Sequence, residues 1–456
     1  MAKETTLFPE FVEKYFGKVI GKITEKYNGE KKKQELLYKT MLAEEYSADL
    51  SWGATELNNV IVAADVVAMD ASIPLKKRGS LATASGKLSK IALKYRKGEK
   101  DISDLNVAAA RGTDEATIAA KVLNDVPRVV DGADARVEMM FEQALSTGSM
   151  LVEDADNDGV GVRVDFYKEA NQFKARIAPW ANSTLASPQD DIQQLFDKAA
   201  EDGNSIAIVM ISKKYFHLFR KSKQGKELAA SYQGRIFTDT TILPVPGKEL
   251  FLNALADEYG AEFRIVDSTF KVQNHDGTEK TIRPWEEANV VGIPTEQVGR
   301  LVYGTLAEET NPVASVSYQK SGSWLLISKY SNNDPLEEYT AGQALVIPVL
   351  DGADSIYLLI ADENAGNALS VADSSKSLSF AKTKETKTVD VAYIGEESNL
   401  AVSASEAFVS ATLKNGVLSI TCAANSASGA GARTATVTVT DGLNSVDIAV
   451  SQAANS

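Results

Sequence analysis

The chain has 456 residues, of which 44% are hydrophobic and 24% charged, an ordinary globular composition. Its length suggests about three domains. Its single cysteine, Cys422, excludes an internal disulfide, and no run approaches the ~18 apolar residues of a membrane span. The first six residues lack the apolar stretch of a signal peptide. With only two histidines, His217 and His275, zinc or Ser-His chemistry is not expected.

The net charge of −14 is distributed unevenly along the chain. Residues 1–150 hold 22 basic and 22 acidic side chains, residues 151–365 hold 20 and 32, and residues 366–456 hold 6 and 8. Within the first part, residues 76–100 carry nine basic side chains against Glu99 alone. We take as candidates for contact between subunits Lys76, Lys77, Arg78, Lys87, Lys90, Lys94, Arg96 and Lys97.

The N-terminal part is expected to be a helical arm followed by an exposed hairpin. Residues 8–46 suggest a helix, since Phe11, Tyr15, Val19 and Ile23 recur at a spacing of four. A β-branched segment at 58–75 follows. The alternation of apolar and basic residues within 76–100, with three glycines, predicts a long exposed hairpin.

A pair of helices is expected next. Thr113 is a plausible N-cap, and apolar residues recur every three or four positions from Ile118 to Ala144. Pro127 should break this run, leaving a long second helix that ends near Thr147, before Gly148. Two strands are predicted after it, at 161–167 and 172–177.

An α/β region then begins at Ser187-Pro188, a strong helix start. Helices are expected at 188–203, 213–220 and 247–258, and strands at 206–211, 262–266, 289–293, 323–328, 343–350 and 355–360.

After Gly366 the composition changes, because residues 366–456 contain no Pro, Trp, His or Met and 15 Ser. Short alternating strands at 388–394, 417–422, 434–440 and 445–451, with turns at Asn415-Gly416 and Asp441-Gly442, predict an all-β sandwich.

Motifs for cofactors and metals are weak. Gly79 and Gly86-Lys87 do not have the spacing of a phosphate-binding loop. A calcium loop is a minor hypothesis, with ligands Asp154, Asp156, Asp158 and Asp165, against an ordinary acidic turn as the main one. His217 is predicted to be a partly buried core residue, and Cys422 a small core residue. No catalytic residues, cofactor or firm metal site are therefore expected.

The order of these elements resembles that of tailed-phage major capsid proteins with the Hong Kong 97-type fold, within them the lambda-like major capsid protein E group. The resemblance rests on Arg136-Val137-Glu138 and Ala144-Leu145 on the long helix, on Val164-Asp165-Phe166, on 289–294 with Val298-Gly299, and on Asp334-Pro335 before 346–350. It implies an α+β fold with these parts: an N-terminal arm (1–60), an extended loop (61–103), a peripheral domain with a spine helix (104–184), an axial domain (185–290), a return to the peripheral domain (291–365), and a C-terminal sandwich (366–456).

The resemblance further implies a structural protein, not an enzyme, that is made in the host cytoplasm and ends up in the phage head. Such proteins assemble as hexamers and pentamers into an icosahedral shell around double-stranded DNA, with portal, scaffold or auxiliary capsid proteins as partners and non-specific contact with the packaged DNA. In that setting the basic loop could lie over the acidic body of a neighbouring subunit. The other reading of these lysines is that they only solvate a hairpin or face DNA.

The tail resembles the BACON-type immunoglobulin-like domain, through Leu378-Ser379-Phe380, 414–420, Asn425, 433–440 and Val450-Ser451-Gln452. That family is linked to carbohydrate binding, but the only aromatic residues here are Phe380, Tyr393 and Phe408. We therefore favour outward display over weak glycan contact. The alternative function is a carbohydrate-binding, adhesin-like surface protein, and a third is a hydrolase with an accessory binding domain.

Overall fold

The computed structural model describes residues 6–29, 36–55, 83–152, 162–166, 171–182, 186–234, 243–273, 278–364, 369–372, 375–393, 397, 400–442 and 444–455. The chain divides into two compact units. Unit 1 comprises the described residues of 1–171, 199–213 and 261–358, and unit 2 those of 172–198, 214–260 and 359–456. In the described part of the chain, no helix is long and apolar enough to cross a membrane.

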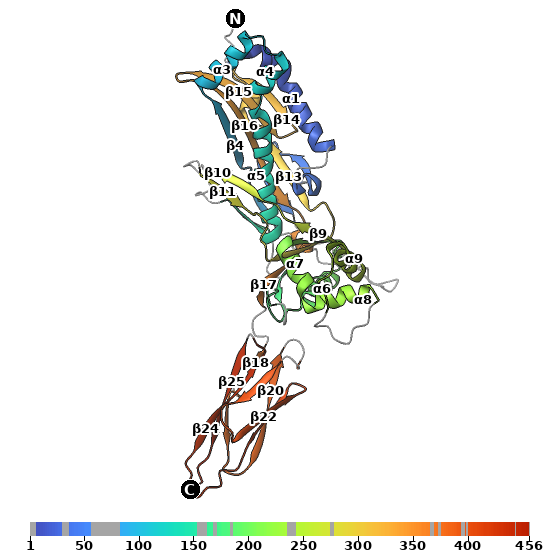
Figure 1. The fold of residues 1–456 in the computed structure, drawn as a ribbon, viewed down its shortest axis with the longest axis vertical. Helices are drawn as coiled ribbons and strands as arrows, with labels where there is room; N and C mark the ends of the chain where they lie inside the picture. Colours follow the sequence, from blue (N-terminus) through green and yellow to red (C-terminus); the bar gives the residue numbers. More distant parts are fainter. Residues whose placement is uncertain are drawn as a thin grey trace, which may run out of the picture. The chain divides into compact units, whose positions relative to one another are not determined.

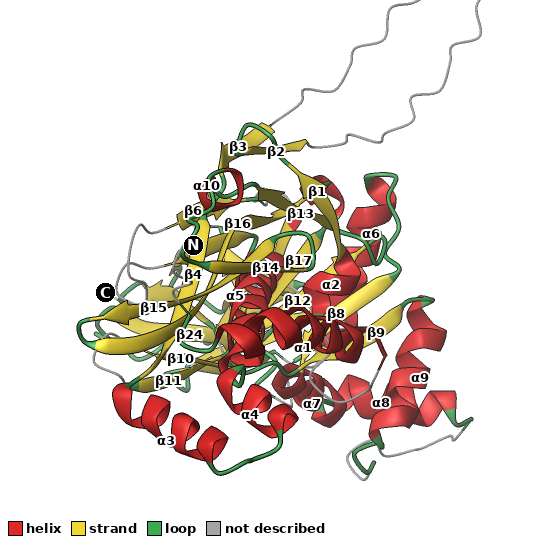
Figure 2. Cartoon of the chain, turned by 90° about the horizontal axis from the view of Figure 1, so that it is seen from above, coloured by secondary structure: helices red, strands yellow, loops and turns green. Residues whose placement is uncertain are grey.

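Unit 1 is built around a long helix and a six-stranded sheet (Figures 1 and 2). The long helix is α5 (Asp125–Thr147). The sheet has the order β1-β13-β16-β15-β14. In addition, β4 pairs with residues 338–345 of β16, and β13 pairs with residues 345–350. Its strands are β1 (Leu42–Tyr46), β4 (Lys90–Lys97), β13 (Gly299–Gly304), β14 (Ser317–Ser321), β15 (Leu325–Asn333) and β16 (Leu336–Leu350).

Smaller elements complete unit 1. The helices are α1 (Pro9–Gly29), α2 (Leu37–Met41), α3 (Glu99–Ala110), α4 (Glu115–Val122) and α10 (Ala307–Thr310), with a 3-10 turn at Ala353–Ser355. The paired strands are β2 (Ser51–Thr55) with β3 (Thr83–Lys87), β5 (Ser149–Val152) with β6 (Val162–Asp165), and β10 (Phe270–Gln273) with β11 (Glu279–Ile282). In addition, β8 (Ile208–Ser212) pairs in parallel with β9 (Glu262–Val266) and antiparallel with β12 (Asn289–Ile293).

The core of unit 1 lies between α5 and the sheet. Val129, Val137 and Phe141 on α5 are fully buried, as are Ile327 on β15 and Val346 on β16. The helix and β16 pack so closely at Gly342 that a Cβ there would lie 2.3 Å from the side chain of Val129. Gly148 ends α5 in the left-handed conformation, with φ at 74°, as the sequence predicted.

In unit 2, β7 (Gln172–Ala175) lies beside β17 (Tyr357–Asn364), a strand that begins in unit 1. The helices are α6 (Pro188–Glu201), α7 (Lys213–Lys221), α8 (Lys223–Tyr232) and α9 (Lys248–Tyr259), with the first residue of α7 and the last three of α6 assigned to unit 1. Aromatic rings form their shared core, since Phe219 packs against Trp180 and Phe251 at centroid distances of 5.4 and 5.0 Å.

Residues 369–455 form a β-sandwich, coloured orange to red in Figure 1. One sheet has the order β18-β20-β23-β22 and the other β19-β25-β24-β21. The strands are β18 (Leu369–Val371), β19 (Ser377–Phe380), β20 (Glu385–Tyr393), β21 (Ala401–Ala404), β22 (Val409–Lys414), β23 (Val417–Cys422), β24 (Arg433–Thr440) and β25 (Ser445–Gln452). The turns at Asn415-Gly416 and Asp441-Gly442 lie where they were predicted, and Cys422 is buried in the core.

The predicted N-terminal helix is wrong in its length and in its buried face. The chain forms α1, then α2, and passes into strand β1 at Leu42, where the prediction continued the helix to 46. Phe8, just before α1, is buried, as are Val12, Phe16 and Ile20 on the helix, whereas Phe11, Tyr15 and Val19 are only half-buried. The apolar face is broad enough to contain two stripes at a spacing of four, and packing on the sheet selected the one that the sequence did not favour.

Two further predictions are wrong. The described strands of 76–100 do not form a hairpin together, because β3 pairs with β2 and β4 pairs with β16. The alternation of 90–97 reflects a strand with one face on α5, since Leu93 contacts the helix at Gly132. His217 is exposed on α7 instead of partly buried, because the buried face of that helix is made by Tyr215, Phe216 and Phe219.

Candidate assembly surface

A two-stranded ribbon, β2–β3, extends from unit 1 (Figure 2). Its base is held by packing, because Trp52 is buried, lies 6.1 Å from the ring of Phe166, and occupies the space that a Cβ on Gly86 would need. Arg300 on β13 adds polar contacts by donating to the carbonyl of Gly53 at 2.8 Å and to Asp351 at 2.6 and 2.8 Å. The base of the ribbon is therefore fixed, and no other strand in the described residues pairs with it.

The predicted basic candidates fall into three groups. Lys76, Lys77 and Arg78 lie outside the described residues. Lys87 on β3 and Lys90, Lys94 and Arg96 on β4 are exposed. Lys97 is buried and forms an ion pair with Asp125 and a hydrogen bond with Asn124, so its prediction as a surface contact is wrong.

The exposed basic residues of β4 lie beside aromatic rings. Arg96 pairs with Glu337 at 2.8 Å, and the ammonium of Lys94 lies 5.3 Å from the ring centroid of Tyr339. Tyr339 is stacked on Tyr330 at 5.3 Å. This strip combines cations with aromatic faces, a combination suited to contact with another surface. A role in contact between subunits stays a prediction.

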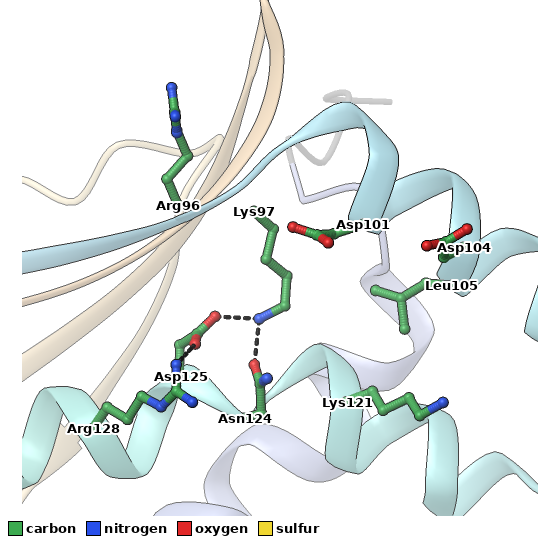
Figure 3. Close-up of a pocket in the computed structure, with 9 residues that line it drawn as sticks. All are labelled: Arg96, Lys97, Asp101, Asp104, Leu105, Lys121, Asn124, Asp125 and Arg128. Carbon is green, nitrogen blue, oxygen red and sulfur yellow. Dashed lines mark hydrogen bonds and ion pairs between the residues drawn. The ribbon is translucent and has the colours of Figure 1, made fainter.

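A charged cavity of about 370 Å³ lies where β4, α3, α4 and α5 meet (Figure 3). Lys97 points across it toward Asp125 and Asn124, and Arg128 lies 3.5 Å from Asp125. All of its lining residues are polar or charged except Leu105, and none is a serine, cysteine or histidine. The cavity therefore offers no Ser, Cys or His nucleophile, and it contains the buried ion pair of Lys97 and Asp125 at the start of α5.

A second buried ion pair holds the N-terminal segment onto the sheet. Lys329 on β15 and Glu338 on β16 are both fully buried and lie 3.2 Å apart. Burial lowers the pKa of Lys329 below its usual range. Glu338 also accepts hydrogen bonds from the hydroxyl of Thr6 at 2.7 Å and from the amide of Leu7 at 3.0 Å. This carboxylate therefore joins the two strands to the beginning of α1.

Three carboxylates along α5 bind neighbouring elements at intervals of four residues. Asp134 accepts hydrogen bonds from Tyr38 at 2.8 Å and from Lys39 at 2.7 Å. Glu138 accepts from the backbone amides of residues 37 and 38 at 2.7 and 2.9 Å, at the start of α2. Glu142 accepts from the hydroxyl of Ser268. Burial raises the pKa of each of the three carboxyls.

From the sequence, Glu138 was identified only as part of a family motif, and neither Asp134 nor Glu142 was identified. The available signal was that Asp134, Glu138 and Glu142 share one face of the helix with buried apolar residues on both flanks. They bind backbone and hydroxyl groups of their own chain, which gives them a positioning role.

In unit 2, Asp191 fixes the segment before α6. Its two carboxylate oxygens accept from the backbone amide of Arg176 at 2.7 Å and from the indole of Trp180 at 2.8 Å. Burial raises the pKa of Asp191 to about 7.

The described residues give no support to the calcium-loop hypothesis. Asp154, Asp156 and Asp158 lie outside the described residues, and Asp165 on β6 is an exposed partner of Arg163 at 3.3 Å. Across the residues that can be described, no group of three His, Cys, Asp or Glu side chains is placed to hold a metal ion.

The aromatic residues of the sandwich are covered. Phe380 is buried in the core, while Tyr393 and Phe408 pack partly buried against it. The guanidinium of Arg433 lies 4.1 Å from the ring centroid of Phe408. None of the three rings is an exposed platform on which a sugar could stack.

Comparison with known proteins identifies the family. The model of the family described as phage major capsid protein E matches residues 22–358, well over half of the chain. A putative prophage capsid protein from E. coli CFT073 is 15% identical, with a TM-score of 0.46 and coverage of 75% of this chain and 98% of that one. A phage-related protein from Bordetella bronchiseptica RB50 is 14% identical, with a TM-score of 0.41 and coverage of 75% and 96%. A Bacteroides ovatus xyloglucanase is 30% identical over only 19% of each chain, with a TM-score of 0.17. None of the curated proteins compared with the chain matches it.

Because these TM-scores are below 0.5, the assignment rests on the family match. The observed mixture of helices and sheets confirms the α+β prediction, and the order of N-terminal helix, two-stranded ribbon, long helix and α/β segment is the one expected for the Hong Kong 97-type fold. The family consists of structural proteins of the phage head, which confirms the predictions of a virion location and of a protein that is not an enzyme. The chain belongs to the phage major capsid protein E family.

Proposed function

We propose that this capsid protein assembles with copies of itself into the hexamers and pentamers of an icosahedral head that encloses double-stranded DNA. The observation that carries the proposal is the ribbon β2–β3, which pairs with no other strand in the described part of the chain. A two-stranded ribbon by itself is marginally stable in water. A neighbouring subunit is the natural surface on which it can pack.

Charge supports the same arrangement. Residues 76–100 carry nine basic side chains and one acidic one, whereas residues 151–365 have an excess of twelve acidic side chains. Among these nine basic residues, Lys87 on β3 and Lys90, Lys94 and Arg96 on β4 are exposed. Attraction between the basic segment of one copy and the acidic body of the next would steer assembly and set its register.

The test is electron microscopy of the purified protein and of two variants. The triple variant Lys76→Glu, Lys77→Glu, Arg78→Glu should remain folded and fail to form shells. The matched control, Lys76→Arg with Lys77→Arg, keeps the charge and should assemble normally. Normal shells from the reversed variant, or a persistent monomer from the unmodified chain, would contradict the proposal.

We further propose that the sandwich, resembling the BACON-type immunoglobulin-like domain, is displayed outward on the head and does not bind glycans. The covered positions of Phe380, Tyr393 and Phe408 support display. A glycan array probed with assembled heads should be blank, and specific binding that is lost when residues 366–456 are deleted would favour the alternative function of a carbohydrate-binding surface protein.

A further inference from the structure

A run of basic side chains on α7 and α8 stands out within the acidic middle of the chain. Residues 214–226 contain Lys214, Arg220, Lys221, Lys223, Lys226 and His217, and no Asp or Glu. By contrast, residues 151–365 as a whole have twelve more acidic than basic side chains. We call this set the α7–α8 basic face.

The fold places these cations on a fixed outer surface. The inner side of α7 packs through Tyr215, Phe216 and Phe219, with Phe216 at 5.6 Å from Phe251. The helical period then puts Lys214, His217 and Lys221 together on the outer side, and all three are exposed.

The junction of the two helices keeps the cations close in space. Ser222 is buried and accepts a hydrogen bond from the amide of Gly225 at 3.0 Å, which caps α8. Gly225 lies so near α7 that a Cβ there would come within 2.1 Å of the carbonyl oxygen of Phe219. Lys221 and Lys223 therefore flank one buried residue at a tight turn.

The charges of three lysines of this face are not neutralised by any described residue. Lys221, Lys223 and Lys226 form no ion pair with any described residue. Arg220 donates from Nε and Nη2 to the carbonyl oxygen of Pro246, at 3.1 and 2.6 Å, and this neutral acceptor leaves its charge intact. Desolvation and the charges of Lys221 and Arg220 lower the pKa of His217, so the charged groups that act on this imidazole are cations.

Two carboxylates near α8 accept hydrogen bonds from glutamine side chains. Gln224 donates to Asp190 at 2.7 Å, and Gln189 donates to Glu258 at 3.2 Å. The first contact joins α8 to the first turn of α6, and the second joins that turn to α9.

We propose that the α7–α8 basic face binds the phosphate backbone of double-stranded DNA without sequence preference. The inference rests on the proposed function for the identity of the polyanion, since the head encloses DNA. Lysine and arginine contacts to phosphates carry sequence-independent affinity. A second copy of the chain is the less suitable partner, because protein interfaces are enriched in aromatic residues and the aromatic rings of α7 are buried.

The experiment measures the anisotropy of a fluorescent random-sequence DNA duplex with the full chain. The variant Lys221→Glu, Lys223→Glu, Lys226→Glu should bind at least roughly tenfold more weakly at about 0.1 M salt. Its slope of log K against log salt should be shallower by about 2–3, since each phosphate contact contributes ~0.9. The control Lys382→Glu, Lys384→Glu, Lys414→Glu makes the same charge change on exposed residues of the sandwich and should bind within about twofold of the unmodified chain.

A second readout follows His217 in the unmodified chain. In chain labelled with ¹³C-histidine, DNA should raise the pKa of His217, because phosphates offset the field of Lys221 and Arg220. Substitution of His217 by Gln assigns its signal against that of His275.

The outcomes separate this inference from the proposed function. Unchanged DNA binding by the triple variant, or an unchanged His217 titration, would overturn it. A variant that still binds DNA but no longer assembles would show that the face contacts another copy, which also overturns it. If the unmodified chain forms no shells but the variant loses DNA binding, the proposed assembly fails and the inference stands.

Discussion

The buried pair of Lys329 and Glu338 makes a quantitative prediction about how the N-terminal segment is held. Lys329→Met removes the cation and leaves Glu338 buried, with hydrogen bonds from Thr6 and Leu7 but no opposite charge. Removing one partner of a buried pair costs about 3–5 kcal/mol, because the remaining charge has lost its water and its counter-ion.

A second substitution should recover part of this cost. In Lys329→Met with Glu338→Gln, the charge is gone while the amide oxygen still accepts from Thr6 or Leu7. The amide NH₂ then lacks a partner, so the double variant should recover on the order of 2 kcal/mol of the loss and not all of it.

Native-state hydrogen exchange is the suitable assay, because a chain of several units does not unfold in one step. The opening free energy of the amides in β15 and β16 should fall in Lys329→Met, while amides of the sandwich strands β23 to β25 should not change. Lys271→Met is the control, since Lys271 forms an exposed pair with Glu279 at 2.7 Å and its loss should have no measurable effect.

The reasoning is refuted if Lys329→Met behaves like Lys271→Met. It is also refuted if the double variant is less stable than both single variants, because charge neutrality in the core would then not be the deciding factor.

Three further predictions concern α5, β13 and α6. Burial raises the pKa of Glu142 to about 8 from an ordinary value of 4.5, so between pH ~4.5 and ~8 the folded state holds a proton that the unfolded state has lost. The contribution of Glu142 to stability should therefore be full below pH ~4.5 and be lost as the pH rises through ~8. In Glu142→Gln the fall in melting temperature between pH 5.5 and 8.5 should shrink, and an undiminished fall would assign it to other groups. A Cβ at Gly299 would lie 2.1 Å from the carbonyl oxygen of Val349, so Gly299→Ala should destabilise unit 1 by about 1–3 kcal/mol in urea unfolding. The control Gly53→Ala, with open space around the glycine, should not, and equal unfolding midpoints for the two variants would contradict this packing. Asp191→Asn presents an amide NH₂ to one of two N–H donors and should lower the free energy of unfolding by about 1–3 kcal/mol. An unchanged unfolding midpoint, followed by tryptophan fluorescence, would speak against the two-donor arrangement.

Local signals in the sequence determined most of the regular elements. Pro127 and Gly148 marked the start and end of α5, and Ser187-Pro188 marked the start of α6, because proline geometry and glycine's left-handed conformation are properties of the residues themselves. The turns at Asn415-Gly416 and Asp441-Gly442 were equally local. The exclusion of a catalytic constellation likewise needed only the residue inventory.

The local sequence pattern could not decide which strands pair or which face of a helix is buried. Alternation in 90–97 predicts a strand, but its pairing with β16, far along the chain, depends on which partner the folded sheet supplies. The same limit explains α1, where two stripes at equal spacing competed and packing chose Phe8, Val12, Phe16 and Ile20.

The charged residues divide in the same way. The sequence by itself determined the net charge, its segregation into a basic segment and an acidic middle, and a chain without catalytic motifs. Only the tertiary structure decided which charged side chains are buried. Lys97, Lys329 and Glu338 are buried in ion pairs, whereas Lys221 and Lys223 are exposed. The physical reason is that a charge costs little in water and several kcal/mol in the interior unless a partner compensates it, and partners from distant strands meet only when the chain has folded.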